Sequence, residues 1–109
     1  MEKTKNAIEA IKFRPLIYIG EKNINSLYTF FRGYTMGLHS CGFGSENDIL
    51  TDFEDWLYIR FKKPGFSNNW CNLLLQEKAN NQELAFNYFF ELFDEFLSEN
   101  LSGNGPLPG

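Results

Sequence analysis

The feature that most constrains the fold is a broad apolar stripe near the C-terminal end of the chain. Apolar residues recur there every three or four positions, the spacing at which side chains share one face of an α-helix. The stripe consists of Leu84, Ala85, Tyr88, Phe89, Leu92, Phe93, Phe96 and Leu97, and Phe86 and Phe90 widen it. Residues 80–83 ahead of it have the form of a capping box. A helix that is apolar over so much of its circumference is predicted to lie at the centre of a bundle.

The rest of the chain carries shorter stretches with the same helical periodicity. We predict helices at residues 4–13, from Asn23 or Asn25 to the glycines Gly42 and Gly44, from Ser45 to about Lys63, and at residues 69–79, the last capped by Ser67 or Asn68. Residues 45–48 have the form of a second capping box. The sequence therefore predicts an all-α, single-domain bundle of about five helices over residues 1–101. A disordered Gly/Pro-rich tail is predicted at residues 102–109.

Two segments are predicted to have special conformations. Residues 15–20 form an apolar, β-branched run that is too short for an ordinary helix, so we expect an extended segment pressed against the core. Gly33 and Gly37 lie one turn apart in a predicted helix, where glycine costs helical propensity. We expect them to be notches that allow a neighbouring element to approach closely.

Charge and cysteine content restrict the compartment and the partners. Residues 1–44 carry 6 Lys and Arg against 3 Asp and Glu, whereas residues 45–109 carry 4 against 11, and the net charge is −4. An acidic surface repels phosphate backbones, so direct nucleic-acid binding is not expected. The N-terminal residues resemble neither a signal peptide nor a membrane span, so we expect a cytoplasmic protein without a membrane role. In that reducing compartment Cys41 and Cys71 should be buried free thiols.

The residues with catalytic potential do not form a recognisable site. His39 is the one histidine and has no obvious catalytic partner in the sequence. His39 with Cys41 and Cys71 is one ligand short of a tetrahedral metal set. Glu46 and Asp48 would repel a phosphate from the glycine-rich turn at residues 42–45. We therefore expect no enzymatic activity, no metal and no cofactor.

Acidic residues on the outer faces of two predicted helices are the best candidates for a binding surface. On the helix that begins near Ser45, the spacing of the aspartates places them on one face, opposite the apolar stripe. Acidic residues of the last helix lie outside its stripe as well. The candidate partner-binding residues are Asp48, Asp52, Glu54 and Asp55 on the first of these helices and Glu91, Asp94 and Glu95 on the second.

One short motif resembles an enzyme segment. Residues 14–20, with the pattern Arg-Pro-x-x-Tyr-Ile-Gly, are similar to a segment near the start of gyrase-type ATPase domains. In those domains the nucleotide is held by a helical Glu with a later Asn, an Asp-x-Gly turn and a Gly-rich lid. None of these has a counterpart in this sequence, so the resemblance does not imply ATP hydrolysis.

A wider resemblance covers residues 11–97. The Arg-Pro-x-x-Tyr-Ile-Gly segment, a Gly-containing aromatic helix, the sequence at residues 53–57, Asn69-Trp70 and the closing aromatic run at residues 85–96 look like a set of small bacterial proteins. Some proteins of this kind are all-helical immunity proteins of contact-dependent growth inhibition and other polymorphic toxin systems. The resemblance implies binding and neutralisation of a cognate toxin domain, such as a cationic nuclease, by occlusion of its active site or substrate groove.

Two other function classes remain beside this one. A non-catalytic adaptor or structural subunit would self-associate through an aromatic surface patch. An enzyme would need a nucleophile and base, a metal set or a phosphate loop, and the sequence provides none of these. The oligomeric state is not determined by the sequence.

Overall fold

In the computed structural model, the N-terminal end of the chain packs as two adjacent helices joined at Arg14. The structure describes residues 2–63 and 69–104. Within these ranges it describes every side chain except those at positions 2, 47, 48 and 100–104. The elements are α1 (Glu2–Phe13), α2 (Pro15–Ile19), α3 (Ile24–Ser40), the 3₁₀ helix η1 (Gly44–Asn47), α4 (Asp48–Arg60), α5 (Trp70–Glu77) and α6 (Gln82–Asn104). The described residues contain no β-strand, which confirms the predicted all-α bundle.

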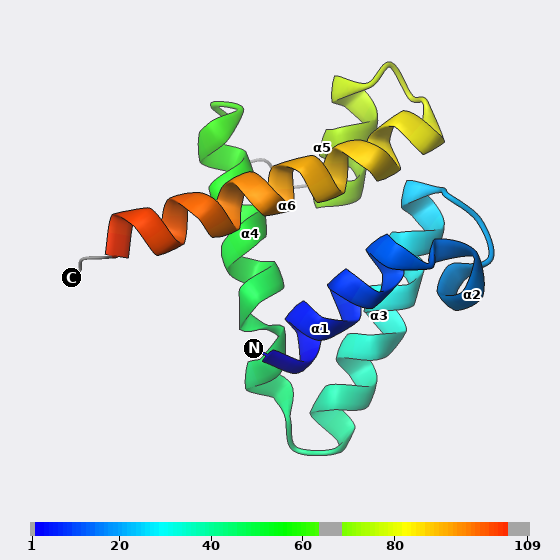
Figure 1. Cartoon of the computed structure of the whole chain (residues 1–109), viewed down its shortest axis with the longest axis vertical. Helices are drawn as coiled ribbons and strands as arrows, with labels where there is room; N and C mark the ends of the chain where they lie inside the picture. Colours follow the sequence, from blue (N-terminus) through cyan, green and yellow to red (C-terminus); the bar gives the residue numbers. More distant parts are fainter. Residues whose placement is uncertain (1, 64–68, 105–109) are drawn as a thin grey trace.

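Helix α6 is the central element, as its apolar stripe predicts. Figure 1 shows it crossing α4 and continuing along α5. Its inward face is aromatic, and Phe89 and Phe93 lie with their ring centroids 5.3 and 5.2 Å from that of Phe53 on α4. Near-perpendicular ring pairs of this kind place the edge of one ring against the face of the other. The centre of the core is therefore a cluster of rings from α4 and α6 with Trp70 of α5, and buried aliphatic side chains of α1 and α3 complete the core.

Asparagine side chains cap three of the helices. Asn23 accepts a hydrogen bond from the backbone N–H of Ser26 at the start of α3, as predicted. Asn69, not the predicted Ser67 or Asn68, caps α5, and those two residues lie outside the described part of the chain. Asn81 accepts from the backbone N–H of Leu84, so α6 begins one residue later than the predicted capping box requires. Each cap satisfies a backbone donor that the helix itself cannot.

Residues 44–47, where a capping box was predicted to begin, form the 3₁₀ helix η1. Glu46 in this turn is bonded to the start of α1, because its carboxylate accepts from the backbone N–H of Lys3 at 3.0 Å. The hydroxyl of the buried Thr4 donates to the Glu46 carbonyl. A tertiary contact with α1 therefore holds this turn, and the side chain of Asp48, the second half of the predicted box, lies outside the described part of the chain. Helix α4 then begins at Asp48 and ends at Arg60, earlier than the predicted Lys63.

The prediction of an extended segment at residues 15–20 is wrong. Pro15–Ile19 forms a one-turn helix, α2, with Pro15 at its first position and Gly20 in the left-handed conformation at its end (φ 83°). Proline has no N–H to leave unsatisfied there and its fixed φ suits a helix start, while glycine tolerates the positive φ that stops the helix. The ends of the segment contact the core, because Pro15 is buried and Ile19 is partly buried, but Leu16, Ile17 and Tyr18 between them are exposed.

The two glycines of α3 are also not packing notches. Gly33 and Gly37 are exposed, and a Cβ atom built on either one meets nothing within 4 Å. The glycine that does permit a close approach is Gly44, where a Cβ would lie 2.6 Å from His39 Nδ1. The spacing of Gly33 and Gly37 in the sequence shows that they share one face of the helix. It does not show whether another element packs against that face.

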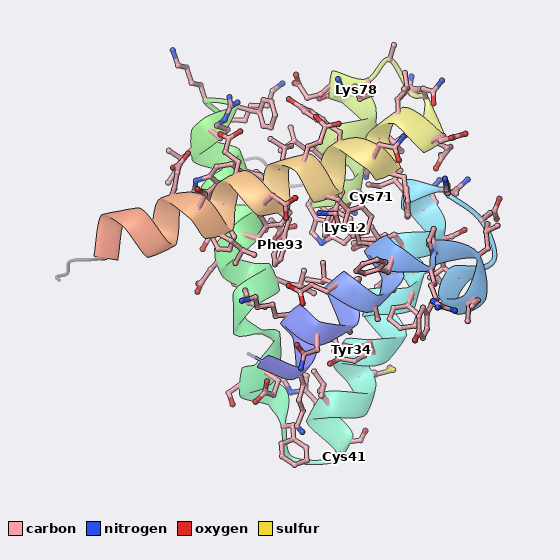
Figure 2. All side chains as sticks on the ribbon, in the orientation of Figure 1. Lys12, Tyr34, Cys41, Cys71, Lys78 and Phe93 are labelled. Atoms are coloured by element: carbon pink, nitrogen blue, oxygen red, sulfur yellow. The ribbon has the colours of Figure 1, made fainter. Side chains whose placement is uncertain are left out.

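The C-terminal end of the chain and one of the two cysteines differ from what the sequence predicts. Helix α6 runs to Asn104, past the predicted domain end at residue 101, and residues 105–109 lie outside the described part of the chain. Both cysteines are free thiols, and Figure 2 shows them far apart, with Cys41 in the turn after α3 and Cys71 beneath α6. Cys71 is buried as predicted, whereas Cys41 is exposed. No helix in the described ranges is long and apolar enough to cross a membrane.

Candidate functional site

The acidic face of α4 presents two carboxylates beside an exposed isoleucine. Asp52 and Asp55 are exposed and lie on the same face as Ile59, whose side chain is 74% exposed. Within the described residues neither aspartate has an ion pair or a hydrogen-bond partner. We call these three residues the acidic ridge. Asp48 opens the same helix, and its side chain lies outside the described part of the chain.

The acidic ridge is held rigidly because the opposite face of α4 is fixed in the core. Phe53 and Leu57 are fully buried. Trp56 is half-buried against Phe96 and donates its indole N–H to Glu99 on α6 at 3.1 Å. A binding surface on a helix anchored in this way loses little conformational freedom when a partner docks.

Glu54 has an internal structural role, although the sequence placed it with the partner-binding acids. Its carboxylate accepts the backbone N–H of Trp70, the first residue of α5, at 3.0 Å. A negative charge at that position also suits the N-terminal end of the helix dipole. Glu54 further interacts with Tyr58, and burial together with the adjacent Glu54 charge and hydrogen bond raises the pKa of the Tyr58 hydroxyl. Glu54 therefore joins α4 to α5.

A groove of about 350 Å³ lies beside the acidic ridge, between α3, α4 and the start of α5. Its lining combines buried apolar side chains with polar and charged ones. The lining residues are Tyr28, Phe31, Arg32, Thr35, Leu50, Thr51, Glu54 and Trp70. Arg32 is exposed and has no ion-pair partner among the described residues. The groove enlarges the polar surface that a partner docking on α4 would meet.

The candidate acids of α6 differ from one another in their partners. Asp94 forms an ion pair with Lys12 of α1 at 2.7 Å, and Glu95 forms one with Arg60 of α4 at 2.8 Å. The hydrogen bond and charge of Glu95 raise the pKa of Arg60. Glu91 is exposed at a depression between α1, α2 and α6 and has no such partner among the residues described. The structure thus brings Asp94 and Glu95 into helix–helix contacts, whereas Asp52, Asp55 and Glu91 have no ion-pair partner in the part of the chain that the structure describes.

The junction of α1 and α2 exposes a group of large apolar side chains, three of which belong to the segment at residues 15–20 that was predicted to press against the core. Phe13 is 86% exposed, Leu16 64%, Ile17 68% and Tyr18 49%. Contiguous exposed apolar residues on a small protein typically mark an interaction surface. We call these four residues the apolar corner. The sequence signal that could have identified it is the proline and glycine that bracket the turn, since they shape a short surface helix.

The remaining chemistry-bearing residues do not assemble into a reaction centre in the described part of the chain. His39 lies in the last turn of α3 with its ring against Gly44. No group of three or more metal-ligating side chains occurs among the described residues. Burial raises the pKa of the Cys71 thiol to about 11, and its Sγ lies 3.0 Å from Asn25 Oδ1. A buried thiol with a raised pKa is a poor nucleophile.

Comparisons with family models, with curated proteins and with solved structures gave no match to this chain.

Proposed function

We propose that the chain is an immunity protein that binds a basic toxin domain through the acidic ridge of α4 and thereby covers the toxin's substrate groove. The observation that carries the proposal is the pair of exposed carboxylates, Asp52 and Asp55, which lack an internal cation among the described residues and flank the exposed Ile59. The protein acts in the cytoplasm of the bacterium that makes the toxin, without cofactor or catalysis.

The chemistry of the ridge suits a cationic partner such as a nuclease. A nuclease groove is lined with Lys and Arg because it binds phosphates, so free carboxylates both attract it and compete with its substrate. Opposite charges raise the association rate, and a desolvated apolar side chain slows dissociation. Asp52 and Asp55 would raise the association rate, and Ile59 would slow dissociation.

The internal contacts divide the candidate acids into two groups. Glu54, Asp94 and Glu95 already have partners within the fold, so replacing them is expected to affect stability before binding. Asp52, Asp55 and Glu91 are free to meet a partner. Asp48 stands one turn before Asp52 at the start of α4, and its side chain lies outside the described part of the chain.

The test is a charge reversal with a matched control. The Asp52→Lys/Asp55→Lys variant is expected to associate with the toxin domain encoded immediately upstream at least about tenfold more slowly than the wild type at low salt. Its association should also depend less on salt, because fewer opposite charges attract. The control variant, Glu9→Lys/Glu77→Lys, changes the net charge equally at other exposed positions and should keep most of the wild-type rate. Equal rates for both variants would exclude the ridge as the binding surface.

A second candidate function is a non-catalytic adaptor or structural subunit that self-associates. The apolar corner favours it, because Phe13, Leu16 and Ile17 are each more than half exposed and find no cover within the described chain. Sedimentation velocity over a concentration series tests it, because a self-associating subunit forms larger species as its concentration rises and a monomeric immunity protein does not.

A further inference from the structure

We propose that the depression between α1, α2 and α6 binds a short zwitterionic peptide, namely a dipeptide with apolar side chains. The inference goes beyond the proposed function and does not rest on the toxin. It rests on three properties of the depression, which are an aromatic floor, one unpaired charge of each sign, and an exposed amide side chain.

The floor of the depression is aromatic, and its volume is about 360 Å³. Phe86 and Phe90, one turn apart on α6, are nearly buried and pack edge to face with their ring centroids 5.1 Å apart. Pro15 of α2 lines the same depression and is also buried. Phe13, at the end of α1, adds a ring that is largely in water. A ligand that covers this ring removes apolar surface from water, which favours an apolar side chain in the depression.

Only some of the charged residues around this floor are available to a ligand. Lys12 of α1, labelled in Figure 2, and Asp94 of α6 neutralise each other through their 2.7 Å ion pair. Lys22, in the turn before α3, and Glu91 of α6 are exposed and have no ion-pair partner among the described residues. Glu21 beside Lys22 is not part of the lining, and it accepts a hydrogen bond from a hydroxyl of α3. One cation and one anion therefore remain for a ligand.

The third property is the exposed amide of Asn87. Asn87, Glu91 and Asp94 are spaced four and three residues apart, so they form one row along α6 beside the depression. The Asn87 side chain has no hydrogen-bond partner in the part of the chain that the structure describes. An amide side chain carries donors and an acceptor, and these match the C=O and N–H of a peptide bond.

These groups together select a ligand that carries both signs of charge. A simple anion would meet the Glu91 carboxylate and a simple cation would meet the Lys22 ammonium, and like charges in a binding site are unfavourable. A dipeptide has a carboxylate for Lys22, an ammonium for Glu91 and a peptide bond for Asn87. Its charged ends lie roughly 7 Å apart, and the flexible stem of Lys22 can follow such a ligand. The depression also has the volume of a small-molecule site, for which the usual range is about 300–1,000 Å³.

A titration with the dipeptide leucyl-phenylalanine tests the proposal, with binding followed by the amide resonances of isotopically labelled protein. The shifts are expected to concentrate at Lys22, Asn87 and Glu91 and to saturate with a dissociation constant of about 1 mM, because the depression is open to solvent. Forms of the same peptide with an acetylated amine or an amidated carboxylate lack one charge each. Each of them should bind about two- to fivefold more weakly than the free peptide.

Two charge variants show which residue meets which end of the peptide. Glu91→Gln should weaken binding of the free peptide about two- to fivefold and leave binding of the acetylated form unchanged, because that form has no ammonium. Lys22→Gln should weaken the free peptide likewise and leave the amidated form unchanged. The matched controls, Glu83→Gln and Lys62→Gln, make the same changes at exposed positions outside the depression. They should bind all three peptides as the wild type does, and all four variants should keep the fold.

A variant of the apolar wall tests the aromatic contact separately. Phe13→Ala removes a ring and no charge, so it should weaken binding of all three peptides equally, by about fivefold. The ring is exposed, so the melting transition should not change.

Four outcomes would overturn the inference. The first is the absence of saturable shifts at the depression up to about 10 mM peptide. The second is a blocked form that binds as tightly as the free peptide, because the charges would then not select the ligand. The third is equal binding by the charge variants and their controls. The fourth is a shift at the depression that grows with protein concentration without peptide, because a second copy would then occupy the site.

The inference and the proposed function fail separately. Lys22 and Asn87 lie outside the acidic ridge, so Lys22→Gln should bind the toxin domain as the wild type does. Loss of peptide binding would leave the immunity proposal standing, and a chain that binds no toxin domain could still bind the peptide.

Discussion

Two apolar regions of this molecule differ completely in their exposure to solvent. The rings of α4 and α6 surround Phe53, which has no exposed surface, whereas Phe13 in the apolar corner is 86% exposed. The first region is covered from several helices, and the second lies at a helix junction at the edge of the bundle. Apolar character alone therefore does not indicate burial. The buried rings stabilise the fold, and the exposed ones are available to a partner.

Truncating one phenylalanine in each region gives the largest predicted contrast. Phe53→Ala removes a ring that contacts Phe89 and Phe93, so the free energy of unfolding should fall by about 3–5 kcal/mol. Phe13→Ala should change it by less than about 0.5 kcal/mol, because that ring is already in water. Urea denaturation of the two variants measures both values. A comparable loss in each would show that the corner is part of the core.

The two cysteines also differ in exposure, and this difference can be tested without mutation. Cys41 is exposed, whereas Cys71 is buried and its pKa is raised to about 11 by burial. At neutral pH the Cys71 thiol should react with a disulfide reagent at least about a hundredfold more slowly than Cys41, which corresponds to roughly 2.7 kcal/mol. Counting labelled thiols against time, in native buffer and in denaturant, measures the ratio. Equal rates in native buffer would contradict the packing of α5.

The acids of α4 should separate into structural and free residues. Glu54→Ala leaves the backbone N–H of Trp70 without its carboxylate partner, so the free energy of unfolding should fall by about 1–2 kcal/mol. Asp55→Ala, the neighbouring exposed acid, should cost less than about 0.5 kcal/mol. Thermal and urea unfolding of the two variants check the difference. If Asp55→Ala were the more destabilising, the ridge would not be free.

The smallest predicted effect belongs to an exposed ion pair. Lys12 and Asp94 join α1 to α6, yet more than a third of each side chain faces solvent, so their coupling energy should be about 0.2–1 kcal/mol. A double-mutant cycle with Lys12→Met and Asp94→Asn measures it, and high salt should reduce it. A coupling unaffected by salt would indicate that the pair is less exposed than the structure shows.

The sequence predicted the elements that depend on local periodicity. The stripe of α6 identified the central helix, and Asn23 identified the start of α3. The short helix α2 was missed because a five-residue apolar run carries no helical period and its β-branched residues favoured an extended segment. Its exposure depends on what lies beside α1, and the sequence does not show that.

The candidate site was predictable only in part, for a similar reason. The exposed positions of Asp52 and Asp55 follow from the spacing of α4. The partners of the other acids do not, because Asp94 meets Lys12 and Glu54 meets Trp70 through tertiary contacts. A pattern of charges on a helix identifies candidates, and only the packing of the helices shows which of them are already paired.

The most direct test of the proposed function is survival of cells that produce the upstream-encoded toxin domain together with this protein. The account predicts that the wild type and the Glu9→Lys/Glu77→Lys control protect the cells and form a one-to-one complex with the toxin domain. The Asp52→Lys/Asp55→Lys variant should be folded but give neither protection nor complex. Full protection by that variant, or no protection by the wild type, would contradict the account.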